Sequence, residues 1–458
     1  MSAVLLIAVP LLAAFLSILS KKIAPYLLLA AALFNIVILF FLPEGFVIIG
    51  GFVQPLGINL LFDPFAKIAL FLVNGLVLVI AFLNLKAFAG FASILLVALA
   101  GLNGLVLTND LFNLFVFLEI AGIAGYLISV SNKKPVHTFH YVVLGAIGSS
   151  LYLFGLIILY AMFGTLNMVG MIEMIETGGN YADLILPFVL MFIGLGVEAK
   201  LLPFNSWVKG VLGKSNTMSG PMIASVYAAA IAFVLGRLIN NLFQFEGPLL
   251  TVVLVILATG IVLGETMAFA STKAREILLY SAVAQASLIA LLFVNGVVIW
   301  AVFLIVANAL SKTVMFLVIN KAAGDTGSDD VNDLQGLFAK NVLVGIAFTL
   351  AALSVMGMPL LVGFVIKLNF LTALAAANQI AFVAIILIAS LVEGIYFIRL
   401  LVKLWYRGDK DLDVKYGLSF KIVFVVIATA LLVFGTYSAP LNQLDNGVDT
   451  IAEVINNG

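Results

Sequence analysis

Long apolar runs separated by short polar stretches repeat along the whole chain. The runs are about 20 residues long, the length that an α-helix needs to cross the hydrocarbon core of a membrane, and this indicates helices rather than barrel strands. The pattern predicts an all-α integral membrane protein with about 14 transmembrane helices. These predicted helices are 3–19, 24–42, 65–85, 91–107, 111–130, 139–163, 184–208, 219–240, 249–270, 277–294, 297–319, 341–377, 379–404 and 419–437.

Two of the predicted helices contain features that break a helix. Pro203 lies in the seventh, within "VEAKLLPFNSW", and the twelfth is too long for one ordinary crossing and contains Pro359 and Gly363 in "GMPLLVG". Proline has no N–H to donate and crowds the preceding turn. We therefore expect predicted helices 7 and 12 to be broken, as in transporters whose ion sites lie near the bilayer midplane.

The positions of Pro203 and Pro359 also predict an internal repeat. Each proline interrupts the fourth helix of a five-helix block, and five is odd, so the second block is inserted with inverted topology. The predicted domains are a three-helix segment at 1–90, a first five-helix repeat at 91–240 and a second, inverted repeat at 249–404. Residues 405–458 supply a loop, a final helix and a short tail.

Lysine and arginine concentrate in the connections that follow odd-numbered helices. Basic loops remain on the cytoplasmic side of a membrane, so both termini are predicted to face outside a multi-pass protein of the cell inner or plasma membrane. The first run has no basic region before it and is interpreted as a retained helix rather than a signal peptide. The basic residues of these loops are Lys21, Lys22, Lys86, Lys133, Lys134, Lys209, Lys214, Lys273, Arg275, Lys321, Lys340, Lys403, Arg407, Lys410, Lys415 and Lys421.

Composition agrees with a membrane protein and limits its chemistry. The chain is 64% hydrophobic and 10% charged, against about 25% charged residues in soluble domains. It has no cysteine and two histidines, which excludes cysteine-ligated iron–sulfur clusters and argues against haem. We expect no cofactor and no metal ion in this chain; in a redox enzyme, other subunits would carry the electrons.

Several charged residues fall inside the predicted helices. Charge near the middle of a membrane helix costs about 2.5–3.5 kcal/mol on insertion scales, so such residues usually face water or one another. Glu119 is a candidate for reversible protonation, with a neutral carboxyl bonded to a neighbouring helix as the alternative. Lys312 is a candidate relay residue or snorkels to the interface. Lys367 follows the break at Pro359 and either holds a proton or only satisfies carbonyls that the break frees.

Three further candidates lie in the first repeat. His140 has a side chain suited to proton relay, although a lone histidine is often structural. Glu198 and Lys200 are two residues apart and cannot pair on a regular helix. Either they address partners on opposite sides of the helix, or the distortion at Pro203 lets them meet. Arg237 ends its helix and is expected to anchor it at the membrane interface.

These segments, taken together, resemble a known family. The set comprises "FNLFVFLEI", "FHYVVLGAIGSSLYLFGLIILYAMFGTLN", "LPFNSW", "SGPMIASVYAAAIAFVLGRL", "STKAREILLYSAVAQAS", "ANALSKTVMFLV" and "GMPLLVGFVIK". It is similar to the large antiporter-like subunits of respiratory complex I, Mrp-type cation/proton antiporters and membrane-bound hydrogenase or sulfur-reductase complexes. The resemblance implies inverted repeats and a chain of buried charges that carries protons along the membrane midplane.

This sequence has the expected residue at some of the family's relay positions and a different residue at others. Glu119, Lys312 and Lys367 match the family's relay positions, and Arg275 falls where the family has a lysine. In the first repeat, Glu198 stands where the family has a lysine, and Lys200 is displaced by two residues.

Two more positions depart from the family pattern. Ala229 stands where a further relay lysine is expected, and Asn308 where many members have a histidine. The first half of the chain therefore differs from its apparent relatives at its centre.

The sequence thus predicts a non-catalytic, proton-translocating subunit of a multisubunit complex, with sodium as a second candidate ion. Its predicted partners are other membrane subunits, including further antiporter-like ones, together with lipid; nucleic acid is not among them. The proposed relay residues are Glu119, His140, Glu198, Lys200, Lys312 and Lys367. A divergent structural subunit without conduction and a stand-alone solute transporter are the alternatives.

Overall fold

The computed structural model describes residues 2–51, 57–85, 90–178, 181–243, 245–406, 408, 412, 414–439 and 441. Lys86, Arg407, Lys410 and the tail 442–458 lie outside these residues. The chain divides into two compact units, Met1–Val253 and Leu254–Gly458, with the boundary inside one helix, α12. Among the described residues, 10 helices are long and apolar enough to cross a membrane.

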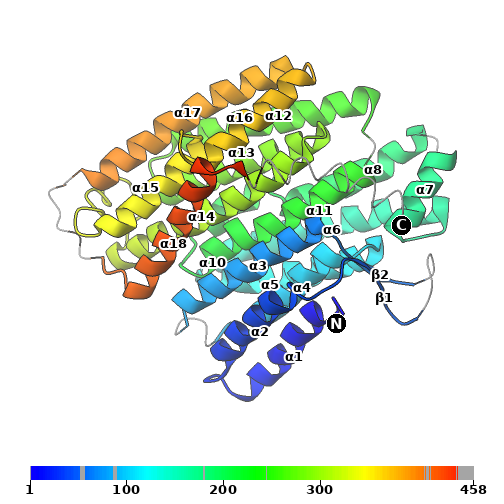
Figure 1. Ribbon diagram of the computed structural model, residues 1–458, viewed down its shortest axis with the longest axis horizontal. Helices are drawn as coiled ribbons and strands as arrows, with labels where there is room; N and C mark the ends of the chain where they lie inside the picture. The colour runs from blue at the N-terminus through cyan, green and yellow to red at the C-terminus, as the bar shows by residue number, and fades with distance from the viewer. Residues whose placement is uncertain are drawn as a thin grey trace. The chain divides into compact units, whose positions relative to one another are not determined.

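The first unit contains α1 to α11 and a short two-stranded sheet in which β1 and β2 pair antiparallel, Gly45 opposite Phe62 (Figure 1). The elements are α1 (Leu5–Leu19), α2 (Ala24–Ile38), β1 (Gly45–Ile48), β2 (Asn59–Phe62), α3 (Pro64–Leu83), α4 (Ala92–Leu107), α5 (Leu111–Val130), α6 (Pro135–Phe163), α7 (Met168–Gly178), α8 (Tyr181–Glu198), α9 (Ser206–Leu212), α10 (Ser219–Pro221), the π-helix η1 (Met222–Tyr227) and α11 (Ala228–Asn241).

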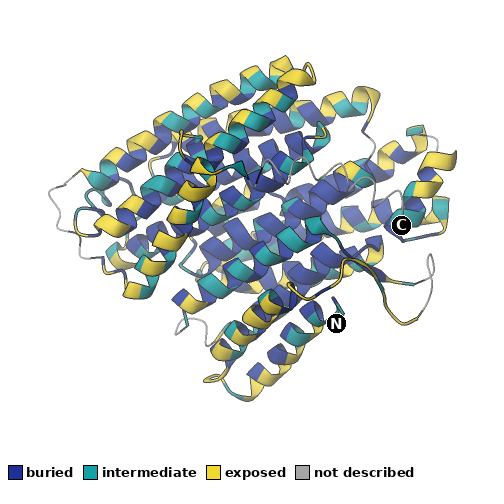
Figure 2. Ribbon diagram, viewed as in Figure 1, coloured by how far each residue is buried: buried dark blue, intermediate teal, exposed yellow. Residues whose placement is uncertain are grey.

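The second unit is formed by helices that begin with the greater part of α12. Its elements are α12 (Gly247–Ala270), α13 (Ala274–Val294), α14 (Val298–Thr326), α15 (Val342–Met356), α16 (Val362–Ala376), α17 (Ile380–Trp405) and α18 (Leu418–Thr436). Figure 2 shows α13 and α14 largely buried, while exposed residues run along α17 and α18. The exposed residues of α17 and α18 are mostly apolar, as expected of surfaces that face lipid or other apolar partners.

Helix α7 was not among the predicted helices. Its sequence, "MVGMIEMIETG", lies in the connection between the predicted helices 139–163 and 184–208. Met168, Met171 and Ile175 are buried at helical spacing, while Glu173 and Glu176 are exposed. Amphipathic spacing of this kind forms a helix on a protein surface, but the segment is too short for the length criterion that identified the other helices.

Buried asparagines join α1, α2, α3 and α4. The side-chain amide of Asn35 donates to the carbonyl of Leu6 at 3.2 Å and to Asn74 Oδ1 at 2.9 Å. The amide of Asn74 donates to Asn103 Oδ1 at 2.9 Å, and Asn103 donates to Leu6 at 2.9 Å. Hydrogen bonds between membrane helices contribute about 0.6–2 kcal/mol each, so this network fixes the first four helices to one another.

A close approach of α6 to α8 sets the position of the end of α8. A methyl group on Gly194 of α8 would lie 2.5 Å from the carbonyl oxygen of Gly148 in α6. Small residues at such a crossing let two membrane helices approach closely. The end of α8, at Glu198, is thereby placed against α6.

The two proline-containing segments are interrupted by the same local motif. After α8, the N–H of Leu201 donates to Gly196 and that of Lys200 to Val197; after α15, the N–H of Met358 donates to Leu353 and that of Gly357 to Ser354. This is the Schellman arrangement, which needs a left-handed residue just past the helix. Lys200 has φ 62° and Gly357 has φ 77°. Helices α9 and α16 then resume beyond Pro203 and Pro359, and Gly363 lies in the first turn of α16.

Candidate functional site

Lys367 lies in α16, one turn beyond the interruption. Its ammonium donates to Glu393 Oε2 at 3.1 Å and to the carbonyl of Met356, the last residue of α15, at 3.0 Å. The side chain of Glu393 is 2% exposed. Lys367 therefore satisfies a carbonyl at the break, as one of the two alternatives expects, and it also pairs with a buried acid.

Glu393 in turn is held by a chain of amides. Its Oε1 accepts from Gln285 Nε2 at 2.9 Å, and Gln285 Oε1 accepts from Asn308 Nδ2 at 3.3 Å. Both oxygens of the carboxyl thus have donors, as a buried charge requires. Asn308, which stands in place of a histidine in the family pattern, reaches the acid through Gln285.

Lys312 is buried in α14 and points to α13. Its ammonium donates to Ser281 Oγ at 2.6 Å and lies 5.5 Å from the centre of the Phe397 ring. Lys312 is 2% exposed. It therefore does not snorkel to the surface of the protein, which was the alternative to a relay position.

Glu265, in α12, is a buried acid for which the sequence offered no role. It is 4% exposed, and its Oε2 has no hydrogen-bond partner among the described residues. It interacts electrostatically with Glu393, Lys312 and Lys367. Two acids and two lysines thus share one buried region of the second unit, which is electrically neutral when all four are ionised.

Glu198 is the centre of the corresponding region in the first unit. Its two carboxyl oxygens accept from Tyr126 of α5 and Tyr141 of α6, each at 3.3 Å. Tyr141 stacks on Trp207 at 3.9 Å between ring centres, and Trp207 Nε1 donates to the carbonyl of Val197 at 3.0 Å. The aromatic pair therefore spans the interruption between α8 and α9 and holds one of the two tyrosines on the acid.

Glu119 and Lys200 both act on Glu198 electrostatically. Glu119 is half-buried in α5, whereas Lys200 is 2% exposed. Lys200 has a left-handed backbone just past the end of α8, and its charge lies within electrostatic range of Glu198.

The two histidines take different positions on α6. His140 is exposed, and it precedes Tyr141, whose hydroxyl contacts the acid. His137 is half-buried and faces α9, because a methyl group on Gly210 would lie 2.8 Å from its Nδ1. His140 is therefore the one relay candidate of the first unit that the structure does not place at Glu198.

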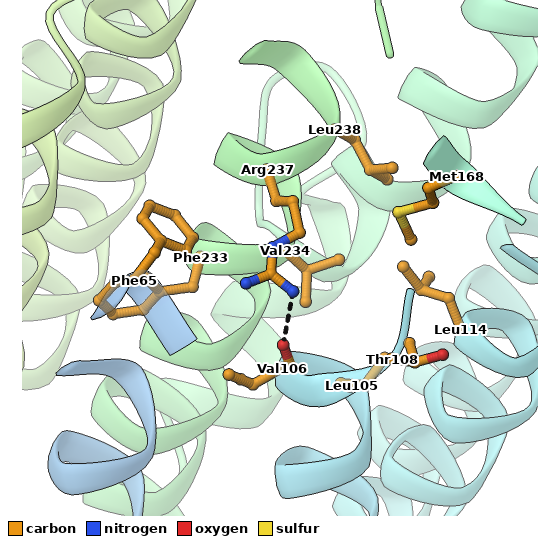
Figure 3. A pocket seen from close by; sticks show the side chains of 10 residues that line it. All are labelled: Phe65, Leu105, Val106, Thr108, Leu114, Met168, Phe233, Val234, Arg237 and Leu238. Atoms are coloured by element: carbon orange, nitrogen blue, oxygen red, sulfur yellow. Dashed lines mark hydrogen bonds between the residues drawn. The ribbon is translucent and has the colours of Figure 1, made fainter. Parts of the chain in front are cut away.

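Arg237 is not an interface anchor, because its side chain is buried and paired. Figure 3 shows its guanidinium bonded to the carbonyl of Val106, at 3.0 Å, and it also pairs with Asp63 at 2.9 Å and lies over the Phe65 ring. The adjoining cavity is about 10 Å³, at the lower limit for one water molecule. Since Asp63 also caps α3, this pair ties α11 to α3 and α4.

Sequence reasoning missed the partners that make these acids a site. Tyr126, Tyr141 and Gln285 are uncharged, so a search for charge in apolar runs passes over them. Glu265 and Glu393 were visible as charges, yet their partners lie on other helices, at no fixed sequence spacing. Among the described residues, no group of three or more histidines and acids could hold a metal ion. The acids, amines and hydroxyls of the two regions are groups that can exchange protons.

Comparisons with known proteins agree with the resemblance noted in the sequence. The model of the family described as NADH:quinone oxidoreductase/Mrp antiporter, TM matches residues 108–392. NADH-quinone oxidoreductase subunit N of Desulforudis audaxviator is 31% identical in an alignment 383 residues long that covers 79% of this chain and 75% of that one. Subunit N of Dehalococcoides mccartyi is 27% identical in an alignment 411 residues long that covers 84% of each chain.

Solved structures share the fold over nearly the full chain. A chain of the membrane-bound sulfane sulfur reductase, an archaeal respiratory membrane complex, has a TM-score of 0.91 and 28% identity over 99% of both chains. A chain of the Mrp complex from a Dietzia species has a TM-score of 0.84 and 20% identity, covering 94% of this chain and 93% of that one. A chain of respiratory complex I from Thermus thermophilus has a TM-score of 0.82 and 22% identity, covering 95% and 97%.

Proposed function

The chain belongs to the NADH:quinone oxidoreductase/Mrp antiporter transmembrane family, and on that premise we propose that it moves protons through its two buried charged regions. The observation that carries the proposal is the pair of Lys367 and Glu393 beside the interrupted α15–α16 segment. Ionisable residues inside membrane segments are rare, and they mark ion paths and proton relays.

The proposed step is a transfer of one proton from the ammonium of Lys367. Glu393 holds the charged amine, and the carbonyl of Met356 accepts a second of its hydrogens. A movement of the interrupted helix that separates Lys367 from Glu393 removes the favourable Coulomb energy of the pair. The amine then gives its proton to the carboxylate of Glu265, which shares the buried region, and the return of Lys367 to Glu393 favours the reloading of Lys367.

Lys312 and Glu265 are the next groups along the proposed path. They share the buried region with Lys367 and Glu393 and interact with them electrostatically. When Lys367 loses its proton, the electrostatic energy of the charged forms of Lys312 and Glu265 therefore changes. Ser281 of α13 accepts a hydrogen bond from Lys312, so its hydroxyl is a further polar group on the proposed path.

In the first unit, Glu198 is the proposed proton-binding group. Tyr126 and Tyr141 contact it directly, and Glu119 and Lys200 act on it through space. In this proposal His140 lies at the exposed start of the path rather than at its centre. The second candidate function, a structural subunit that lost conduction in this unit, is favoured by Ala229, which is 2% exposed and offers no titratable group.

We further propose that the chain crosses the inner or plasma membrane 14 times, with both termini outside. Two inverted five-helix repeats span 91–240 and 249–404, and the other crossings lie in the segments 1–90 and 405–458. The helix bounds and the shared motif after α8 and α15 support this topology. Other antiporter-like membrane subunits are the proposed partners, and sodium is a second proposed ion.

The test removes the charges of the second unit. Lys367→Met alone leaves Glu393 buried without its partner. The double variant Lys367→Met/Glu393→Gln is therefore measured as well, because it removes both charges of the pair and leaves neither unpaired. With the parent complex in sealed vesicles, we expect proton uptake, measured with a pH-sensitive dye, to fall at least tenfold in both variants.

The matched control neutralises a surface pair. Lys321 and Asp325 lie 2.9 Å apart, and both are about one-third exposed; Lys321→Met/Asp325→Asn should leave uptake unchanged. Uptake at the unmodified level in the folded double variant would exclude conduction by the second unit. Glu198→Gln, measured in parallel, separates the two candidate functions, because only a conducting first unit loses uptake.

A further inference from the structure

An open apolar groove of about 350 Å³ lies on the first unit between α1, α4 and α5. It is lined by Leu11, Phe15 and Ile18 of α1 and by Ile123 and Leu127 of α5, among others. Phe15 and Ile18 are 71% and 72% exposed. Ser93 is the one polar residue among its lining side chains, so its ligand is a hydrocarbon.

One end of the groove is basic. Ile18 lies within one helical turn of Lys21 and Lys22, in the turn between α1 and α2, and Leu127 is followed by Lys133 and Lys134 between α5 and α6. All four lysines are exposed. Ser93, near the start of the antiparallel α4, belongs to the same end. An apolar channel that ends beside four cations is complementary to a molecule with a hydrocarbon tail and an anionic head.

The groove follows α1 for about two helical turns. Its lining on α1 runs from Leu11 to Ile18, about 10 Å along the axis. A hydrocarbon chain fits this space.

We propose that the groove is a binding site for an anionic phospholipid, with one acyl chain between α1, α4 and α5 and the phosphate beside Lys21 and Lys22. Each lysine near an anionic head group contributes about fivefold to binding. Removing both therefore reduces the preference for anionic over zwitterionic lipid by about 25-fold. This proposal is independent of proton conduction by either unit.

The test uses phosphatidylglycerol that carries a photoreactive diazirine near the middle of one acyl chain. The purified full-length chain is placed in liposomes with this probe, irradiated and analysed by peptide mass spectrometry. We expect labelled peptides from α1, α4 and α5. Unlabelled phosphatidylglycerol should compete at least tenfold better than phosphatidylcholine.

Two variants with matched controls locate the head and the tail. Lys21→Gln/Lys22→Gln should lower labelling at least tenfold, while Lys403→Gln in α17 leaves it unchanged. Val97→Phe fills the groove and should block labelling, while Leu12→Phe, at an exposed α1 position outside the lining, should not. Each variant is compared by its thermal unfolding midpoint, so loss of labelling is separated from loss of fold.

Two outcomes would overturn the proposal. In the first, phosphatidylcholine and phosphatidylglycerol compete equally and labelling persists in Lys21→Gln/Lys22→Gln. This result would mean that the groove contacts bulk bilayer lipid without selecting it. The other is a protein that covers the groove. Because the chain has no cysteine, Ile18→Cys provides a single thiol, and its cross-linking to another subunit in the intact complex would identify that case.

Discussion

At the scale of single residues, the acids of the two units are balanced by different chemistry. Glu198 has hydroxyl donors, Tyr126 and Tyr141, whereas Glu393 has an ammonium and an amide, Lys367 and Gln285. A hydroxyl can donate to a charged carboxyl and accept from a neutral one. The first unit therefore accommodates either charge state of its acid without rearranging side chains, while the second couples the charge of its acid to that of a lysine.

Tyr141→Phe tests the hydroxyl donor in the first unit. The ring still stacks on Trp207, but Glu198 loses one of its two donors, and a hydrogen bond of this length contributes about 0.5–1.5 kcal/mol. We expect a lower thermal unfolding midpoint in detergent and slower proton uptake in vesicles. Tyr160→Phe, at a 51% exposed position of the same helix, should change neither, and an unfolding midpoint identical to the parent for Tyr141→Phe would show that the hydroxyl does not hold Glu198.

At the scale of elements, the two interruptions share one motif but differ in the residue at its left-handed position. Gly357 has no side chain to strain, whereas Lys200 accepts a conformation that costs a non-glycine residue about 1–2 kcal/mol. Strain of this kind persists where the surrounding structure fixes it, often at functional sites. The Trp207 bond to Val197 is one such constraint, and Lys200 is buried within electrostatic range of Glu198.

Gly357→Ala tests the interruption in the second unit. Its φ of 77° is unfavourable for alanine, and the added methyl group would lie 2.9 Å from Cδ of Lys367. We expect a loss of about 1–2 kcal/mol in unfolding free energy and impaired proton uptake, because Lys367 must move away from Met356. Gly324→Ala is the control, since Gly324 is helical with no atom within 4 Å of the added group; it should be neutral or stabilising by up to about 1 kcal/mol. Equal effects of the two changes would refute this role of Gly357.

At the scale of the whole molecule, each compact unit contains its own buried charged region. Glu198 and its partners belong to Met1–Val253, and Glu265, Lys312, Lys367 and Glu393 belong to Leu254–Gly458. No residue type in the chain can ligate an iron–sulfur cluster through sulfur, because cysteine is absent. In the proposed function, the energy for directed proton movement comes from other subunits.

Purification from native membranes in mild detergent tests this dependence. We expect the chain to co-migrate with other membrane subunits. Mass spectrometry should identify among them either subunits that contain redox centres or further antiporter-like chains. The isolated chain in liposomes should not generate a proton gradient. If the isolated chain generated a proton gradient when only a solute gradient was imposed across the liposome membrane, that result would instead support a stand-alone transporter.

The sequence by itself determined the membrane class, most helix positions and the two interruptions. Membrane helices need about 20 apolar residues each, and every backbone polar group must be satisfied within the helix, so length and composition are enough to locate them. Pro203 and Pro359 each lie just past a break, where proline has no N–H to donate to a helix, although Pro10 and Pro187 lie inside α1 and α8. The exceptions are short elements: α7 and the β1–β2 pair lack the length on which this reasoning depends.

Only the tertiary structure decided which buried groups meet. The sequence offered Lys367 and Glu393 as separate charges 26 residues apart, and it gave Tyr126, Tyr141 and Gln285 no role. Contacts between helices depend on which faces pack together and at what depth, and no spacing along one helix encodes either. Lys200 shows the same limit, because the sequence encodes neither its left-handed backbone nor the packing of α5, α6 and α9 around the end of α8.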